Sequence, residues 1–212
     1  MLNRGNARRT IFEKDADYAA FERILAEAQA RVPMRILAWC LMPNHWHLVL
    51  WPHSDGALPQ YMRLVALTHT HRWHARRATA GTGHLYQGRY KAFPVQEDGH
   101  LLVVCRYVER NALAGGLVER AEHWRWCSLW RAHSAPSGQS PRIDDWPLAR
   151  PSAWLDEVNR PAAPAEMDAV RRSVRRGTPY GDPVWIGRTV QRLGLESTLR
   201  PRGRPKRPEK GS

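Results

Sequence analysis

Apolar positions in the first quarter of the chain predict one helix followed by two strands. From about Asp15 to Arg31, apolar residues recur at intervals of three and four, which is typical of a helix with one buried face. Two apolar segments follow, Met34–Leu41 and His45–Trp51, separated by Met42-Pro43-Asn44. Because the Pro-Asn pair favours a turn, we expect these two segments to form a β-hairpin.

Helical spacing returns from Leu58 to about Arg77, and a third helix is predicted to begin at Asp98 and end near Gly115-Gly116. Between these helices, residues 84–96 have the aromatic and β-branched content of a strand. This order of elements is typical of an α+β sandwich with helices on one face of a mainly antiparallel sheet. With residues 2–5 as a remnant of a leading strand, it becomes the ferredoxin-like arrangement.

The composition changes after residue 133, which predicts three regions. Residues 1–133 form the α+β domain, and residues 134–199 form a proline-rich linker with a small helical extension. Within this extension, helices are predicted at about 165–176 and 183–193. Residues 200–212 are basic and rich in proline and glycine, so we expect a disordered tail.

The net charge of the chain indicates the kind of partner that it binds. The chain has 33 basic and 20 acidic residues, a net charge of +13, and nearly all of the positive charge is arginine. Such a balance favours a polyanionic partner, most commonly a nucleic acid, although a GC-rich genome also enriches arginine. No apolar run approaches the roughly 20 residues needed to cross a bilayer, and the N-terminus has no secretory pattern.

The three cysteines, Cys40, Cys105 and Cys127, are widely spaced in apolar contexts, which favours buried thiols over a disulfide frame or a zinc site. Unpaired thiols in a chain without a secretory pattern are typical of a cytoplasmic protein, here one associated with the nucleoid.

His45-Trp46-His47 is the first candidate for chemistry. Alternate residues of a strand project to one face, so the two imidazoles point together while Trp46 points to the other side. Two histidines side by side on a sheet supply half of a divalent-cation site. The alternative is an incidental pair, which ten histidines in the chain make easy.

The predicted third helix carries a second candidate. Tyr107 and Asn111 are four residues apart, hence neighbours on one helical face. A tyrosine hydroxyl becomes a nucleophile when a nearby cation polarises the electrophile, and an amide oxygen can complete the coordination. Considered alone, this helix favours a core tyrosine and an asparagine cap.

Taken together, the motifs resemble those of the REP-associated tyrosine transposases. These are relatives of the single-strand insertion-sequence transposases in the HUH nuclease superfamily, whose name describes the histidine, hydrophobic residue, histidine motif. The order and spacing of the matching blocks agree over roughly residues 3–135. The blocks are Arg4-Gly5-Asn6, Leu41-Met42-Pro43-Asn44-His45-Trp46-His47, Gly88-Arg89-Tyr90-Lys91, Arg106-Tyr107 with Asn111, and Gly116-Leu117-Val118.

The resemblance implies a metal-dependent DNA strand transferase. His45, His47 and Asn111 would bind Mg²⁺ or Mn²⁺, and Tyr107 would attack the scissile phosphate to give a 5′-phosphotyrosine and a free 3′-hydroxyl. The substrates implied are single-stranded DNA with palindromic hairpins and a guide tetranucleotide, bound by a monomer or a homodimer. The alternatives are a catalytically silent, domesticated hairpin-binding protein and an RNA-binding or ribonuclease role.

This sequence departs from the family pattern in three places. Almost nothing of the family's first strand precedes Arg4, so either translation begins further upstream or the sheet is incomplete. Trp46 is bulkier than the usual aliphatic residue. After Asn111 the family continues Pro-Val-Arg-Ala-Gly, whereas Ala112–Gly116 lacks the proline and the arginine, which removes an expected DNA contact.

Further DNA contacts are predicted outside the reacting groups. Arg4 belongs to the first matching block, and Arg89 and Lys91 are expected on one strand face, where they either follow phosphates or form a solvated edge. Arg202 and Arg204 lie in a tail similar to an AT-hook, whose arginines favour a narrow minor groove. The alternative for this tail is a generic basic segment that adds non-specific affinity.

Overall fold

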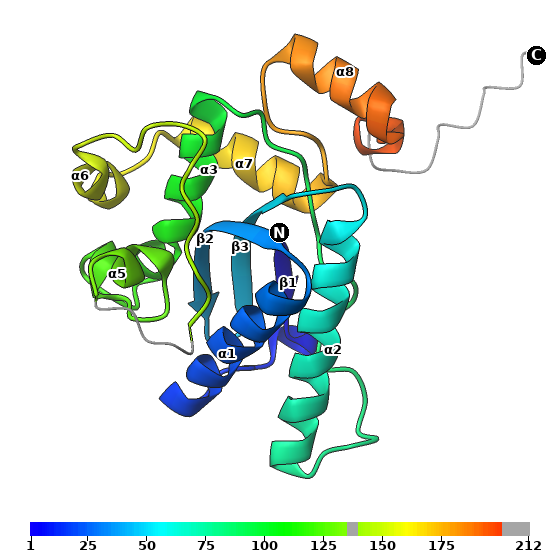
Figure 1. The fold of residues 1–212 in the computed structure, drawn as a ribbon. Coiled ribbons are helices and arrows are strands. Elements are labelled where there is room, and N and C mark those ends of the chain that lie inside the picture. The colour runs from blue at the N-terminus through cyan, green and yellow to red at the C-terminus, as the bar shows by residue number, and fades with distance from the viewer. Residues whose placement is uncertain (135–139, 201–212) are drawn as a thin grey trace, which may run out of the picture.

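The computed structural model describes residues 1–134 and 140–200. Figure 1 shows a small sheet surrounded by helices. The strands and α-helices in chain order are β1 Leu2–Arg4, α1 Asp15–Arg31, β2 Met34–Met42, β3 His45–Pro52, α2 Ala57–Arg77, α3 Gly99–Glu109, α4 Asn111–Ala114, α5 Ser128–Ala132, α6 Trp154–Asn159, α7 Pro164–Arg176 and α8 Pro183–Leu193. Short 3-10 turns add Asn6–Arg8, Ala121–His123 and Glu196–Thr198.

The sheet has three antiparallel strands in the order β1-β3-β2, so β3 lies at its centre. The predicted hairpin is confirmed, because β2 pairs with β3 across the turn that contains Pro43 and Asn44. The leading strand is also present, although β1 pairs over only three residues. The α+β class with an antiparallel sheet is therefore confirmed.

One face of the sheet packs against α1 and α2, which lie in front of it in Figure 1. Trp39 and Leu41 of β2 and Trp46 of β3 are fully buried there, together with Phe21 of α1 and Tyr61 of α2. This cluster is the larger of the two hydrophobic cores. It forms because the apolar faces of both helices match the apolar positions of two adjacent strands.

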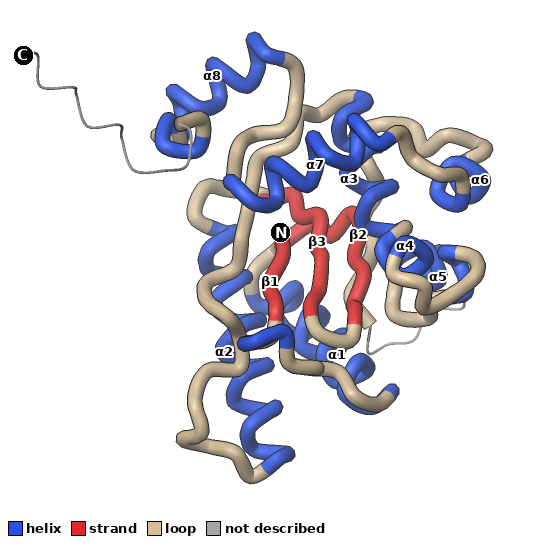
Figure 2. Tube along the Cα trace, turned by 180° about the vertical axis from the view of Figure 1, so that it is seen from behind, coloured by secondary structure: helices blue, strands red, loops and turns tan. Residues whose placement is uncertain are grey.

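The opposite face is covered by α3, which corrects the prediction of helices on one face only. Figure 2, seen from behind, shows α3 and α7 on this side of the strands. Leu37 and Cys40 of β2 pack here with Val104 and Val108 of α3. The physical reason is that β2 is apolar at almost every position, so both of its faces need to be removed from water.

The strand predicted over 84–96 is present only as isolated bridges. Lys91 exchanges backbone hydrogen bonds with Leu2, and the Gln87 amide donates to the carbonyl of Arg4. The five residues from Gln87 to Lys91 therefore span the three residues of β1, and the two extra residues form a bulge near Gly88. The bulge prevents a regular ladder between this segment and β1.

The C-terminal extension packs on α3. The two helices predicted in it are confirmed as α7 and α8. The Arg110 guanidinium of the α3–α4 junction donates to the carbonyls of Val158 and Asn159 in α6, at 2.8 and 2.7 Å. Val170 of α7 is fully buried in the core on the α3 face of the sheet. Of the predicted tail, residues 201–212 lie outside the described residues.

Two further expectations concern cysteines and membranes. Cys40, Cys105 and Cys127 are all buried and unpaired, as predicted. Among residues 1–134 and 140–200, no helix has both the length and the apolar character needed to cross a bilayer.

A buried carboxyl group connects α3 to the elements that follow it. Glu109 is fully buried and accepts hydrogen bonds from the Ser128 hydroxyl of α5 and the Trp154 indole of α6, both at 2.7 Å. Burial raises the pKa of Glu109 above its usual range, while these two hydrogen bonds oppose the shift. Three helices are therefore held together at one polar point inside an apolar core.

Replacing this carboxyl group tests that connection. Glu109→Leu leaves the Ser128 hydroxyl and the Trp154 N–H without acceptors, so we expect the free energy of unfolding to fall by about 2 kcal/mol or more. Glu109→Gln keeps one acceptor oxygen and is expected to lose less. Denaturant titrations of both variants measure the two effects.

The pH dependence has a definite sign. The pKa of Glu109 is higher in the folded protein than in the unfolded chain, where it is near 4.5. Proton binding to Glu109 therefore stabilises the fold below pH 4.5, and this stabilisation is lost as the pH rises through the folded pKa. Glutamine does not titrate. The stability of Glu109→Gln relative to the parent chain should therefore increase as the pH rises above about 4.5. A difference that stays constant as the pH rises would contradict the raised pKa of the buried carboxyl group.

Candidate active site

The central strand holds two imidazoles on the α3 side of the sheet. His45 and His47 alternate along β3, and their ring centroids lie 5.1 Å apart. Trp46 projects to the other side, where its indole donates a 3.0 Å hydrogen bond to the Tyr86 hydroxyl. The predicted alternation is therefore confirmed: Trp46 packs in the core, and His45 and His47 face α3.

A neighbouring amide orients His45. The Nδ1 atom of His45 lies 2.6 Å from Oδ1 of Asn44, and Nδ2 of Asn44 donates to the carbonyl of Arg8. Since an amide oxygen only accepts, Nδ1 of His45 carries the proton and Nε2 keeps its lone pair. This tautomer leaves one ring nitrogen ready to bind a cation, and it is the type of outer contact that orients metal-binding histidines.

Both imidazoles are neutral over the physiological range. Burial, followed by the charge of Arg4, lowers the pKa of His45 from 6.5 to about 4. Burial also lowers the pKa of His47 well below its usual range, with smaller effects from His45 and Arg4. Neutral imidazoles with depressed pKa values are weak bases, but they coordinate a cation without first losing a proton.

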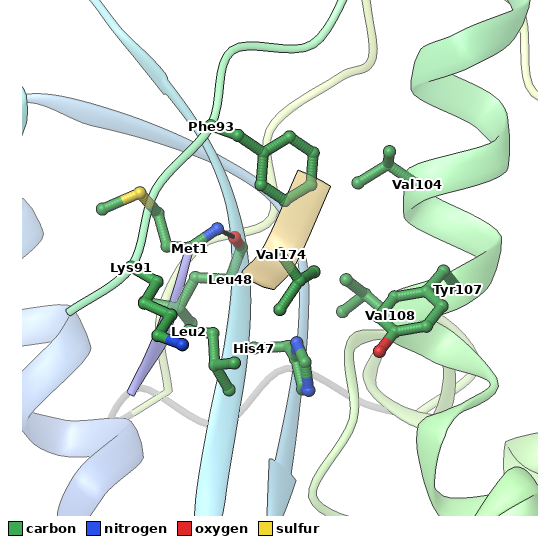
Figure 3. A pocket seen from close by; sticks show the side chains of 10 residues that line it. All are labelled: Met1, Leu2, His47, Leu48, Lys91, Phe93, Val104, Tyr107, Val108 and Val174. Atoms are coloured by element: carbon green, nitrogen blue, oxygen red, sulfur yellow. Dashed lines mark hydrogen bonds between the residues drawn. The ribbon is translucent and has the colours of Figure 1, made fainter. Parts of the chain in front are cut away.

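Tyr107 of α3 lies against this pair. Its ring centroid is 5.6 Å from that of His47, with the two rings nearly perpendicular. In Figure 3 the Tyr107 hydroxyl is directed toward the His47 ring, between β3 and α3. The two side chains line a small cavity of about 20 Å³ together with Lys91, Phe93 and Val174. The structure therefore brings together a phenol and two imidazoles that are 60 residues apart in sequence.

Burial also acts on the phenol. It raises the pKa of Tyr107, while the charges of Arg171 and Arg4 partly offset this effect. The hydroxyl is therefore protonated near neutral pH, and it becomes a strong nucleophile only when positive charge is brought close to its oxygen.

Asn111 lies one turn beyond Tyr107, at the start of α4. Its Nδ2 atom donates to the Tyr107 carbonyl at 2.8 Å, which fixes the orientation of the amide. The remaining amide atom, Oδ1, is an acceptor. The described residues contain no group of three or more His, Cys, Asp or Glu side chains that could hold a metal ion. A cation here needs an amide, solvent or substrate oxygen to complete its coordination.

The predicted DNA-contacting residues are divided between the site and the undescribed tail. Arg4 is the register partner of His45 on β1, so its side chain shares the face of the imidazoles. Arg89 and Lys91 line a second cavity with Arg4. Arg202 and Arg204 lie outside the described residues.

Tyr86, a second buried tyrosine, lies on the opposite side of the sheet from Tyr107. Its hydroxyl is buried between the Trp46 indole and Nδ1 of His69, which is 2.5 Å away. Burial strongly raises its pKa, with an opposing effect of the hydrogen bond from Trp46. This tyrosine joins α2 to the sheet and faces away from the imidazole pair.

Sequence reasoning missed two contributions to the site. Asn44 was part of a recognised motif, but its hydrogen bond to His45 depends on the turn geometry. Val174 of α7 lines the cavity between His47 and Tyr107, and Arg171 acts on the pKa of Tyr107. The only local signal for these α7 residues is a basic helix in the extension, which resembles any solvated helix.

Comparisons with known proteins identify the family of the chain. The family model described as "Transposase IS200 like" matches residues 1–111, a range that contains both histidines, Tyr107 and Asn111. A solved structure described as the REP-associated tyrosine transposase bound to a REP hairpin is similar at 15% identity and a TM-score of 0.49, over 68% of this chain and 90% of that chain. No curated protein sequence matches the chain. Because the family model covers more than half of the sequence, this chain belongs to the IS200-like transposase family.

Proposed function

We propose that this protein cleaves and rejoins single-stranded DNA through a covalent bond to Tyr107. The observation that carries the proposal is the contact between Tyr107 and His47, whose ring centroids are 5.6 Å apart on the sheet face that also presents His45. Membership in a transposase family and a net charge of +13 support DNA as the substrate.

His45 and His47 are proposed to hold Mg²⁺ or Mn²⁺, with Oδ1 of Asn111 as a further ligand. The donor set fits such an ion, because the tautomer of His45 leaves a nitrogen lone pair and the orientation of Asn111 leaves an oxygen. Phosphate oxygens of the substrate and water would complete the coordination of such an ion. When bound, the cation polarises the scissile phosphate and neutralises part of its charge.

The reaction conserves phosphate ester bonds. The Tyr107 oxygen forms a bond to phosphorus as its proton passes to solvent, and the bond from phosphorus to the 3′ oxygen breaks. The leaving oxygen keeps the bonding electrons and takes a proton from solvent, which gives a free 3′-hydroxyl and a 5′-phosphotyrosine. Attack by a 3′-hydroxyl on this intermediate reverses the step and joins strands, so no nucleotide cofactor is required.

Palindromic hairpins of the REP type are the proposed targets. This assignment rests on the sequence blocks that resemble REP-associated tyrosine transposases, including Arg4-Gly5-Asn6 and Gly88-Arg89-Tyr90-Lys91. Arg4, Arg89 and Lys91 are proposed to bind DNA near the site. Arg202 and Arg204 of the tail are proposed to add contacts to the flanking DNA.

Covalent adduct formation tests the nucleophile. With a labelled single-stranded DNA hairpin and Mn²⁺, the parent chain should form an adduct that survives denaturing electrophoresis. Tyr107→Phe removes the attacking oxygen and should reduce the adduct below detection while hairpin binding persists. Tyr90→Phe removes a phenol outside the cavity and serves as the matched control.

An undiminished adduct in Tyr107→Phe would overturn this assignment. Absence of any adduct from the parent chain, together with tight and salt-sensitive binding of the hairpin, would identify a catalytically silent hairpin-binding protein instead.

The hydrogen bond from His45 to Asn44 generates a second prediction. Asn44→Ala removes the acceptor that holds the tautomer of His45, and removal of such an outer hydrogen bond typically weakens metal binding about 10- to 100-fold. Titration of Mn²⁺ followed by electron paramagnetic resonance should show this weakening. The exposed His53 provides a control, because His53→Ala should leave the affinity unchanged. Equal affinity in Asn44→Ala and the parent chain would contradict the proposed orientation of His45.

A further inference from the structure

Helix α7 forms one wall of the candidate active site, although it follows the family-matched region by more than 50 residues. Val174 lines the small cavity between His47 and Tyr107, and it points toward them in Figure 3. Val174 also lines a second, larger cavity of about 380 Å³ on the β1 side. The two cavities share Leu2, Lys91 and Val174 in their linings, so they lie next to each other.

The larger cavity is basic, and we call it the basic groove. Its cations are Arg4 of β1, Arg89 and Lys91 of the bulged segment, and Arg175 of α7. None of the described side chains that line it is acidic. Four cations from three separate parts of the chain face one space, and its charge complements a phosphodiester strand.

Arg171 is a further cation on the face of α7 that holds Val174 and Arg175. Arg171 precedes Val174 and Arg175 by three and four residues, so the three side chains lie on one face of the helix. Arg171 is exposed and lies one turn before Val174, which lines the cavity at His47 and Tyr107. Arg172 is exposed and lies on a different face.

Helix α7 is held in place by buried side chains and by an ion pair with α3. Val170 and Ser173 are buried against the rest of the protein. Arg106 of α3 forms an ion pair with Glu166 of α7 at 3.6 Å, and its guanidinium also donates to the carbonyl of Arg160 at 2.8 Å. These interactions fix α7 to the helix that carries Tyr107, so the position of its arginines is coupled to the position of the nucleophile.

We propose that Arg171 and Arg175 of α7 bind the phosphates of the single strand next to the scissile bond, and that the C-terminal extension thereby completes the substrate site. This proposal rests on the proposed function for the identity of the strand. Because the two cavities lie next to each other, we place the strand that follows a scissile phosphate at His47 and Tyr107 along the basic groove.

The salt dependence of binding tests the proposal without any chemistry. Binding is measured in EDTA with two probes, a DNA hairpin that carries a single-stranded flank and the same hairpin with a blunt end. Each cation that no longer neutralises a phosphate of a single strand lowers the slope of log affinity against log salt by about 0.7. Arg171→Gln/Arg175→Gln should therefore lower the slope by about 1.4 with the flanked hairpin and leave the blunt hairpin unaffected.

Matched variants distinguish phosphate contacts made by Arg171 and Arg175 from a general effect of lower net charge. Arg172→Gln removes one charge from another face of α7 and should keep the parent slope. Arg171→Lys/Arg175→Lys keeps both charges and should retain most of the slope. Thermal unfolding midpoints equal to that of Arg172→Gln establish that the double glutamine variant is folded.

Two outcomes would overturn the proposal. The first is a slope for the double glutamine variant equal to that of Arg172→Gln. The second is an equal decrease in slope on the blunt hairpin, which would assign these arginines to the duplex stem. Both results are independent of adduct formation by Tyr107, so a failure of this inference is distinguishable from a failure of the proposed function.

Discussion

The alternation of side chains along β3 is the constraint on which the rest of the structure depends. Because β3 is the central strand and both of its faces are covered, each of its residues is committed to one of two environments. Trp46 enters the core under α1 and α2, whereas His45 and His47 face α3. A shift of one residue in register would exchange these environments, so the packing of Trp46 also determines where the imidazoles point.

Burial then sets the chemical state of the site. The same removal from solvent lowers the pKa of both histidines and raises that of Tyr107, so all three groups are neutral near neutral pH. Neutral imidazoles can coordinate a cation without first losing a proton, and a protonated phenol needs nearby positive charge to become a strong nucleophile. Arg4, opposite His45 on β1, supplies part of that charge to the imidazoles and to the phenol.

The C-terminal extension belongs physically to this site. Glu109 joins α3 to α5 and α6, and Arg106 joins α3 to α7. The helix that carries the candidate nucleophile is therefore held from behind by the extension, while Val174 of the extension reaches the cavity in front of Tyr107. An element outside the family-matched region thus contributes both support and lining to the active site.

Local patterns alone determined the hairpin of β2 and β3, the five longer helices and the opposite orientations of Trp46 and His47, because these depend on periodicity and turn chemistry. The short helices α4, α5 and α6 were not predicted as separate elements. The family was also readable, since the spacing of its motifs is a property of the chain. Tertiary structure decided what depends on packing between segments distant in sequence. This includes the placement of α3 on the second face, the bulge around Gly88, and the approach of α7 to Tyr107. Each follows from interactions between distant segments, for which a single sequence carries no local signal.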